Sequence, residues 1–230
     1  MSARGRGGHP FARHWNHNTN YYPRIAELVA DHRVVLDVGC GEGTLARYLA
    51  TGDTEPVTLR RADLKGVQPE LESFDDRQLR HEVVGIDADS KVLPPDAPGA
   101  HFMLADAQQL PFPDASFDAV VSVEVLHHLN EDLGLVEMRR VLRPGGRLVV
   151  VDTARSSFPL GPLEIRDLIA NVAMGVGKTR WTPDTLSSEP DLNWAQSREL
   201  IEGNLPGAHW WRVPLWRWVA VWDAPGATSR

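Results

Sequence analysis

Three glycines stand at alternate positions within residues 35–43, VLDVGCGEG, directly behind Asp37. Glycine is costly to order, so Gly39, Gly41 and Gly43 indicate a tight turn or a close approach of the backbone to another group. A glycine turn that opens a helix exposes backbone N–H groups and favours anionic groups. The spacing G-x-G-x-G differs from the G-x-G-x-x-G of dinucleotide sites, and Asp37 would repel a pyrophosphate. A ligand with a cation beside a carboxylate, such as an amino acid moiety, fits better.

Two more acidic residues follow apolar stretches further along the chain. Asp87 ends EVVGID, where a carboxylate can accept hydrogen bonds from both hydroxyls of a ribose. Asp106, in LADAQQLPF, is placed to accept from an exocyclic amine such as that of adenine. An amino acid, a ribose and an adenine together describe a single molecule.

Apolar strands and amphipathic helices alternate in the part of the chain that positions these residues. Such alternation predicts a parallel sheet with helices on both faces. The end of the chain, HWWRV followed by Pro214 and LWRWVAVW, predicts two strands joined by a tight turn, with both faces buried. Base stacking on nucleic acid is the weaker reading of this tryptophan-rich stretch. The expected strands are 34–38, 82–87, 100–106, 117–126 and 147–152, and the expected helices are 24–32, 43–50 and 131–142.

Four successive motifs carry a resemblance to a known family. VLDVGCGEG, VVGIDAD, LADAQQLPFPDASFDAVVSVEVLHHL and VLRPGGRLVVVD resemble, in order, those of class I S-adenosylmethionine-dependent methyltransferases of the small-molecule type. The resemblance covers residues 34–152. It implies a Rossmann-like α/β fold: a seven-stranded, mostly parallel sheet with helices on both faces and a C-terminal antiparallel hairpin, its last strand inserted between two others.

The resemblance also implies S-adenosyl-L-methionine as cofactor and a set of residues that hold it. Gly39 and Gly41 would face the methionine part, Asp87 the ribose and Asp106 the adenine, with Glu124 near the methionine end. One of the tyrosines ahead of the first helix would reach the cofactor. The expected cofactor-binding residues are Tyr21, Tyr22, Asp37, Gly39, Cys40, Gly41, Asp87, Ala88, Ala105, Asp106, Ala107 and Glu124.

His127 and His128 follow the fourth strand on the ligand side and are the candidate catalytic residues. A histidine titrates near neutral pH, so it suits removal of a proton from an acceptor hydroxyl. Neighbouring side chains point in different directions, so we expect at most one of the two to face the acceptor. The alternative is a histidine that holds its loop by hydrogen bonds. We expect no metal site.

The 230 residues predict one methyltransferase domain with four segments around its centre. Residues 1–9 are expected to be disordered, and 10–31 to form an N-terminal lid that includes Trp15, His17 and Asn18. Residues 52–82 form an insert, within which PELESFDDRQLRHE predicts a further helix. Residues 153–193 are the expected substrate cap, where an apolar stripe recurs at helical spacing: Ile165, Leu168, Ile169, Val172 and Val176.

Composition and sequence motifs limit the chemical class of the methyl acceptor. A net charge of −7 argues against nucleic acid, and SVEV stands where an Asn/Asp-Pro-Pro-Tyr motif would indicate amino-nitrogen methylation. No secretory signal, membrane span or basic amphipathic helix is visible, so we expect a cytoplasmic protein with no membrane partner. The expected partner is a small-molecule acceptor methylated on O, N or C, such as a secondary metabolite, and a homodimer is possible.

Three alternatives stay open at this point. The acceptor could be a quinone precursor, or the chain could bind the cofactor without catalysis, as a sensor or assembly partner. A nicotinamide-dependent dehydrogenase is disfavoured by the glycine spacing.

Overall fold

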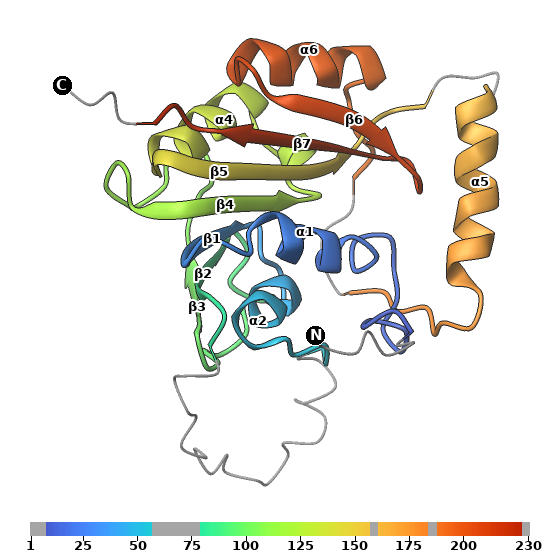
Figure 1. Cartoon of the computed structure of the whole chain (residues 1–230), viewed down its shortest axis with the longest axis horizontal. Coiled ribbons are helices and arrows are strands. Elements are labelled where there is room, and N and C mark those ends of the chain that lie inside the picture. Colours follow the sequence, from blue (N-terminus) through green and yellow to red (C-terminus); the bar gives the residue numbers. More distant parts are fainter. Residues whose placement is uncertain (1–7, 57–78, 157–160, 184–187, 227–230) are drawn as a thin grey trace, which may run out of the picture.

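Seven strands form one sheet in the computed structural model, which describes residues 8–56, 79–156, 161–183 and 188–226. The strand order is β3-β2-β1-β4-β5-β7-β6 (Figure 1). Six strands run parallel, and β7 runs antiparallel between β5 and β6. The predicted fold class is therefore confirmed. The strands are β1 (Val34–Val38), β2 (Glu82–Asp87), β3 (Ala100–Leu104), β4 (Phe117–Val123), β5 (Leu142–Thr153), β6 (His209–Val213) and β7 (Arg217–Asp223).

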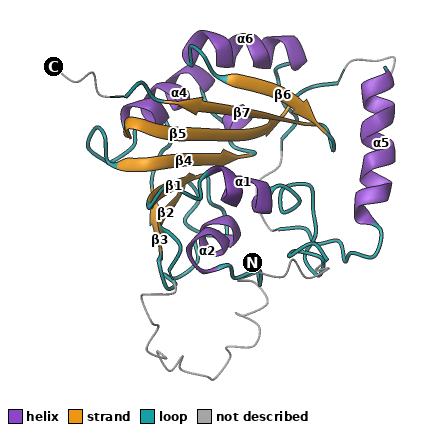
Figure 2. Ribbon diagram, in the orientation of Figure 1, coloured by secondary structure: helices purple, strands orange, loops and turns teal. Residues whose placement is uncertain are grey.

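Helices cover both faces of this sheet (Figure 2). Helices α1 (Tyr22–Leu28) and α2 (Thr44–Thr51) pack on one face, and α4 (Glu131–Arg140) and α6 (Trp194–Asn204) on the other. Helix α5 (Pro162–Gly175) stands beside the sheet, beyond the end of β6 and β7 (Figure 1). The sheet therefore separates two apolar cores, each made by alternate side chains of the same strands.

Strand β1 lies in the middle of the sheet and sets where the functional residues meet. Its β-branched run is buried on both faces, and Asp37 pairs in register with Gly85 of β2 and with Val121 of β4. Parallel neighbours end at the same edge of a sheet. The turn after β1, Asp87 at the end of β2 and the residues after β4 and β5 therefore come together at one edge.

The sequence-based boundaries differ from the structure in several places. Strand β5 begins at Leu142 rather than 147, with a shift of register opposite Phe117 and Ala119. Trp216 of the predicted second strand lies instead in the turn before β7, at φ 56°, whereas Trp218 and Trp222 belong to β7 and are buried in the same core. Helix α6 was not predicted, although Asn193 and Gln196 cap its first turn reciprocally. Most of the helix expected in the insert lies outside the described residues.

Helix α5 is attached to the sheet by buried ion pairs. Arg212 of β6 lies 3.1 Å from a Glu164 carboxylate oxygen and 2.6 Å from one of Asp167, with all three side chains nearly inaccessible to solvent. The predicted apolar stripe is present on α5, but it points outward. The acidic residues turn the opposite side of the helix toward the protein. That residues 153–193 form a substrate cap stays a prediction.

Replacement of Arg212 by Met should destabilise the protein by about 3 kcal/mol, because it removes the cation from buried Glu164 and leaves buried Asp167 with Arg166 alone. Arg198→Met is the matched control. Its ion pair with Glu202 is 2.7 Å long but more than half exposed, and such pairs contribute about 0–1 kcal/mol. Urea denaturation measures both free energies of unfolding. Equal losses in the two variants would show that the Arg212 pairs do not hold α5.

Candidate functional site

A cavity of about 690 Å³ lies at the edge of the sheet where the parallel strands end. Cavities of this size hold nucleotide-like and drug-sized ligands. The turn after β1 and the residues after β2, β3 and β4 form one side, and the N-terminal segment and the loop after α5 form the other. The predicted residues that line it are Tyr22, Gly39, Cys40, Gly41, Asp87, Ala88, Ala105, Asp106, Ala107, Glu124, His127 and His128.

Two predicted cofactor residues lie outside this lining. The Tyr21 hydroxyl donates a hydrogen bond to the carbonyl of Pro214 in the β6–β7 turn. Asp37 is buried behind the glycine turn, where burial and the neighbouring Asp87 raise its pKa to about 8. Of the two tyrosines, Tyr22 is thus the one placed to meet a ligand.

The glycine turn is required by packing as well as by any ligand. Gly39 has φ 69°, and a Cβ there would lie 2.1 Å from a methyl carbon of Val125. Gly43, at φ 73°, precedes α2, and a Cβ there would lie 2.5 Å from the ring of Phe102. Only glycine combines this left-handed backbone with such near neighbours. The turn therefore packs directly against the residue that follows Glu124.

Backbone groups orient the carboxylate of Asp87 in the cavity. One oxygen accepts a hydrogen bond from Gly41 N at 2.9 Å, and the other accepts from Asp89 N at 2.9 Å. Asp106 at the rim accepts from Gln108 N at 2.8 Å. Ionised carboxylates retain further acceptor sites when each oxygen holds one donor. This set of acceptors, in a lining that also includes apolar Ile86, fits a ribose and an adenine as the resemblance implies.

Glu124 lies at the methionine end of the expected cofactor site in a strained conformation. Its φ of 60° is unusual for a residue with a side chain, and such strain gathers at functional sites. A carboxylate oxygen lies 2.9 Å from Arg217 Nε as an ion pair, although the two atoms are out of line for a hydrogen bond. Burial raises the pKa of Glu124; Arg217 opposes this effect and Asp152 adds to it.

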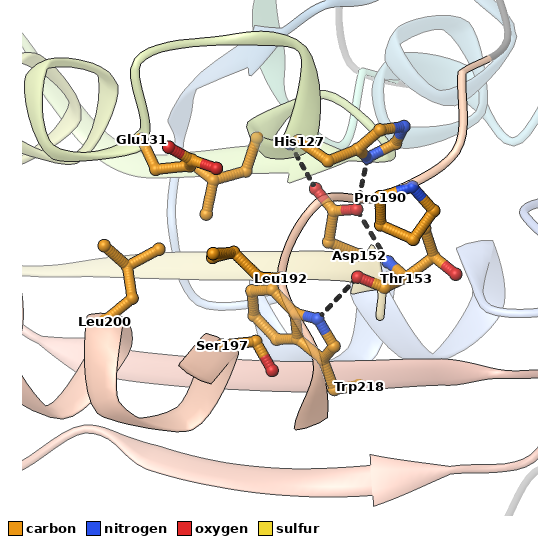
Figure 3. A pocket seen from close by; sticks show the side chains of 10 residues that line it. His127, Glu131, Asp152, Thr153, Pro190, Leu192, Ser197, Leu200 and Trp218 are labelled. Carbon is orange, nitrogen blue, oxygen red and sulfur yellow. Dashed lines mark hydrogen bonds and ion pairs between the residues drawn. The ribbon is translucent and has the colours of Figure 1, made fainter. Parts of the chain in front are cut away.

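His127 forms a buried pair with Asp152 at the end of β5 (Figure 3). Its Nδ1 lies 2.6 Å from an Asp152 carboxylate oxygen, and its backbone N donates to the other oxygen at 3.3 Å. Burial alone would lower the pKa of His127, but hydrogen bonding and charge from Asp152, with help from Glu124, leave it above the ordinary value of 6.5. Nδ1 is thus engaged, and Nε2 is the ring nitrogen left for a ligand in the cavity.

A second cavity, of only about 10 Å³, is lined in part by this pair (Figure 3). Its walls include the apolar side chains of Leu126, Leu200 and Trp218. That volume is about the space of one water molecule. Asp152 is therefore shielded from bulk solvent, and the low local dielectric strengthens its interaction with His127.

His128 lines the large cavity as well. The two imidazole rings lie 4.1 Å apart, and Nδ1 of His128 is 2.9 Å from the Ser188 hydroxyl. Burial and the neighbouring His127 lower the pKa of His128. Both histidines line the cavity because both belong to a 3₁₀ turn, Leu126–His128, rather than to an extended strand. That at most one of them faces the acceptor stays a prediction.

The pairing of Glu124, His127 and Asp152 also has the composition of a metal site. One donor atom from each residue lies within 4.8 Å of the others. Arg217, however, already places its guanidinium against Glu124, where it competes with a metal cation for the same carboxylate. The absence of a metal remains a prediction.

The N-terminal segment and the loop after α5 form one continuous wall. Trp15 N donates to Thr179 O at 2.9 Å, and Trp181 N donates to Trp15 O at 2.9 Å. His17 Nε2 lies 3.0 Å from the Asn171 side-chain oxygen on α5. Trp15, His17 and Asn18, expected in the lid, all line the cavity. The contribution of the 153–193 segment comes from its loop rather than its helix: Arg180, Trp181, Thr182, Pro183 and Ser188.

Sequence reasoning missed Asp152 and Arg217. Asp152 ends the predicted strand 147–152, as Asp87 ends EVVGID, so the same signal could have found it. Arg217 lies in the C-terminal hairpin, which the sequence predicts as a buried edge of the sheet. No sequence pattern around Arg217 indicates a place in the cavity.

The chain is similar to known proteins over most of its length. Residues 36–150 match a family model described as a methyltransferase domain. A fatty-acid O-methyltransferase of Mycolicibacterium smegmatis is 35% identical over 69% of this chain and 55% of its own length. A 27-O-demethylrifamycin SV methyltransferase of Amycolatopsis mediterranei is 34% identical over 62% of this chain and 46% of its own length. The chain thus spans about half the length of these relatives.

A solved structure shares the fold. That of a SAM-dependent methyltransferase from Methanosarcina mazei superposes with a TM-score of 0.54 and 19% identity, covering 89% of this chain and 98% of the other. Similarity at this level of identity shows the arrangement of the sheet and helices alone.

Gly39→Ala should destabilise the protein and weaken its affinity for S-adenosylhomocysteine by about tenfold or more, because the added Cβ meets Val125 and the left-handed backbone costs about 1–2 kcal/mol. Gly145→Ala is the matched control, since Gly145 has φ 77° and nothing within 4 Å of its added Cβ. Calorimetry measures affinity, and urea denaturation measures stability.

The double variant Gly39→Ala, Val125→Ala separates the two causes, because it removes the steric contact and keeps the backbone cost. It should recover part of the affinity. Equal effects of Gly39→Ala and Gly145→Ala would contradict a role for the Gly39–Val125 contact.

Proposed function

We propose, on the premise that this chain belongs to the methyltransferase domain family, that it transfers the methyl group of S-adenosylmethionine to a hydroxyl oxygen of a small, partly apolar molecule. One observation carries the oxygen acceptor: His127, whose ring is held by Asp152, lines the same cavity as the glycine turn, Asp87 and Asp106. The two relatives described above are named for O-methylation of a fatty acid and for methylation of 27-O-demethylrifamycin SV. Because the chain spans only part of them, its acceptor is inferred from its own cavity.

The residues around the glycine turn would hold the cofactor, which supplies an activated methyl group on a sulfonium. Gly39 and Gly41 present backbone groups to the methionine end, where Glu124 offers a carboxylate to the ammonium. Asp87 accepts from the ribose hydroxyls and Asp106 from the adenine amine. Tyr22 closes this side of the cavity.

His127 would accept the proton of the acceptor hydroxyl at Nε2. Asp152 holds the ring through Nδ1 and stabilises the positive charge that forms on the imidazole, as a carboxylate does for a general base in other enzymes. The raised pKa of His127 makes it a stronger base, and the neutral, reactive form exists above that pKa. A hydroxyl acceptor needs such a base, whereas an ionised carboxylate acceptor does not.

The wall made by the N-terminal segment and the loop after α5 would bind the acceptor and exclude water. Trp15 and Trp181 give this wall apolar area, and Asn18 and Arg180 give it polar groups. Much of the catalysis in a methyl transfer to an activated donor lies in holding the two reactants in line in a dry pocket. A quinone precursor is one acceptor of this description.

His127→Ala should lower turnover by about 10²–10⁴-fold while leaving affinity for S-adenosylhomocysteine unchanged. Transfer of a radiolabelled methyl group to a panel of phenols, alcohols and hydroxylated lipids measures turnover, and calorimetry measures affinity. His101→Ala is the control, because His101 is exposed on β3 and pairs with Asp96 away from the cavity.

Unchanged turnover in His127→Ala would remove the base. Binding of the cofactor without transfer to any acceptor of the panel would favour a non-catalytic binding module instead.

A further inference from the structure

Helix α5 presents an unusual surface to solvent. Six large apolar side chains on it and at its C-terminal cap are between 47% and 73% exposed. They are most of the large exposed hydrophobic residues in the described part of the chain, and all of them but Leu163 recur at helical spacing along one side of the helix. We call the five residues that share a side of the helix the α5 apolar face: Ile165, Leu168, Ile169, Val172 and Val176.

No charged side chain of α5 shares this face. Glu164 and Asp167 are buried against Arg212, and Arg166 binds Asp167 and donates to Val213 O at 3.1 Å. A solvent-facing helix surface ordinarily carries charges, and contiguous exposed apolar patches mark interaction sites. The polar side of α5 is thus used for attachment, and its apolar side is left outward.

Basic residues gather at the C-terminal end of this face. Lys178 Nζ lies 5.1 Å and the Arg180 guanidinium 5.7 Å from the centre of the Trp15 ring, which packs below the last turn of α5. Arg13 is exposed on the adjoining segment, next to Ala12, whose carbonyl accepts from Thr179 N. The same end borders the large cavity, since Arg180 and Trp181 line it.

We propose that the α5 apolar face docks on an anionic lipid surface, with α5 lying in the plane of the headgroups and the basic end on their phosphates. This proposal goes beyond the methyl transfer inferred above and does not depend on it. None of the helices in the described ranges is long and apolar enough to cross a bilayer, so α5 lies on the surface. The cavity then opens beside the lipid, from which an apolar acceptor enters.

Charge favours a lipid surface over a second copy of the chain as the occupant of the α5 apolar face. A copy of α5 would offer no free acid to Lys178 and Arg180, because Glu164 and Asp167 are already paired within each chain. Lipid phosphates supply that counter-charge. The sequence predicted no membrane partner because it shows neither a membrane span nor a basic amphipathic helix. In the structure the basic residues lie just beyond α5, and the rest of the protein covers the polar side of α5.

Co-sedimentation of the full chain with vesicles tests the proposal. We expect binding to equal parts of phosphatidylcholine and phosphatidylglycerol, and much weaker binding to phosphatidylcholine alone. Ile169→Gln with Val172→Gln should weaken binding by about tenfold or more, since apolar burial drives interfacial binding. The matched control is Leu133→Gln with Val136→Gln, two residues of similar exposure on α4, which should bind as the unaltered chain does.

Lys178→Ala should weaken binding by about fivefold, and added salt should weaken it further. Absence of binding to either vesicle, or equal loss in the α4 control, would overturn the proposal. Analytical sedimentation tests the alternative occupant, a second copy of the chain. If the unaltered chain forms a dimer that Ile169→Gln with Val172→Gln dissociates, and if it does not bind vesicles, the lipid proposal is overturned in favour of that second copy.

Discussion

The contact between His127 Nδ1 and Asp152 joins the ends of two neighbouring strands at the point where the cavity begins. Asp152 is 1% exposed, and a buried carboxylate is costly unless it is paired and hydrogen-bonded. His127 and the backbone N–H of Thr153 satisfy one oxygen, and the backbone of His127 satisfies the other. Folding thus requires that the buried Asp152 carboxylate be paired, and this pairing fixes the orientation of the imidazole in the cavity.

The same edge of the sheet is held from the other side by the turn after β1. Gly39 packs on Val125, which lies between Glu124 and the 3₁₀ turn that carries His127. Gly41 donates to Asp87 at the end of the next strand. A displacement of this turn would thus reach both the proposed ribose site and the proposed base. The cofactor side and the acceptor side of the cavity share one packed unit, which suits a reaction governed by alignment.

The positions of the parallel strands along the chain could be predicted from the sequence because buried parallel strands are continuous apolar runs, such as VVLDV and RLVVVD. The insertion of the last strand between two others was implied by the family resemblance. Residues at the ends of those strands followed directly: Asp87, Asp106 and the glycine turn line the cavity, as the sequence analysis expected. Asp37 and Tyr21 do not line the cavity. The strand register decides the direction of Asp37, and the hydrogen bond from the Tyr21 hydroxyl to the Pro214 carbonyl decides that of Tyr21. Neither cause is visible in a local sequence pattern.

Tertiary charge pairs account for what the sequence analysis missed. The helical stripe of α5 has the spacing of a core helix, and only the ion pairs of Glu164 and Asp167 with distant Arg212 reverse the side that faces the protein. Arg217 reaches Glu124 across 93 positions of sequence. Pairs so far apart in the chain leave no local periodicity, whereas Asp152, at the end of a predicted strand, does leave a local signal.

The central claim is that Asp152 sets the basicity of His127, and titration of the His127 ring by NMR tests it most directly. It needs no knowledge of the acceptor, and it can be carried out with S-adenosylhomocysteine present. The account predicts a midpoint above 6.5 for the unaltered protein and a lower midpoint for Asp152→Asn, because loss of the carboxylate leaves burial to disfavour the charged ring. Equal midpoints in the two proteins, or a midpoint below 6.5 in the unaltered one, would contradict it.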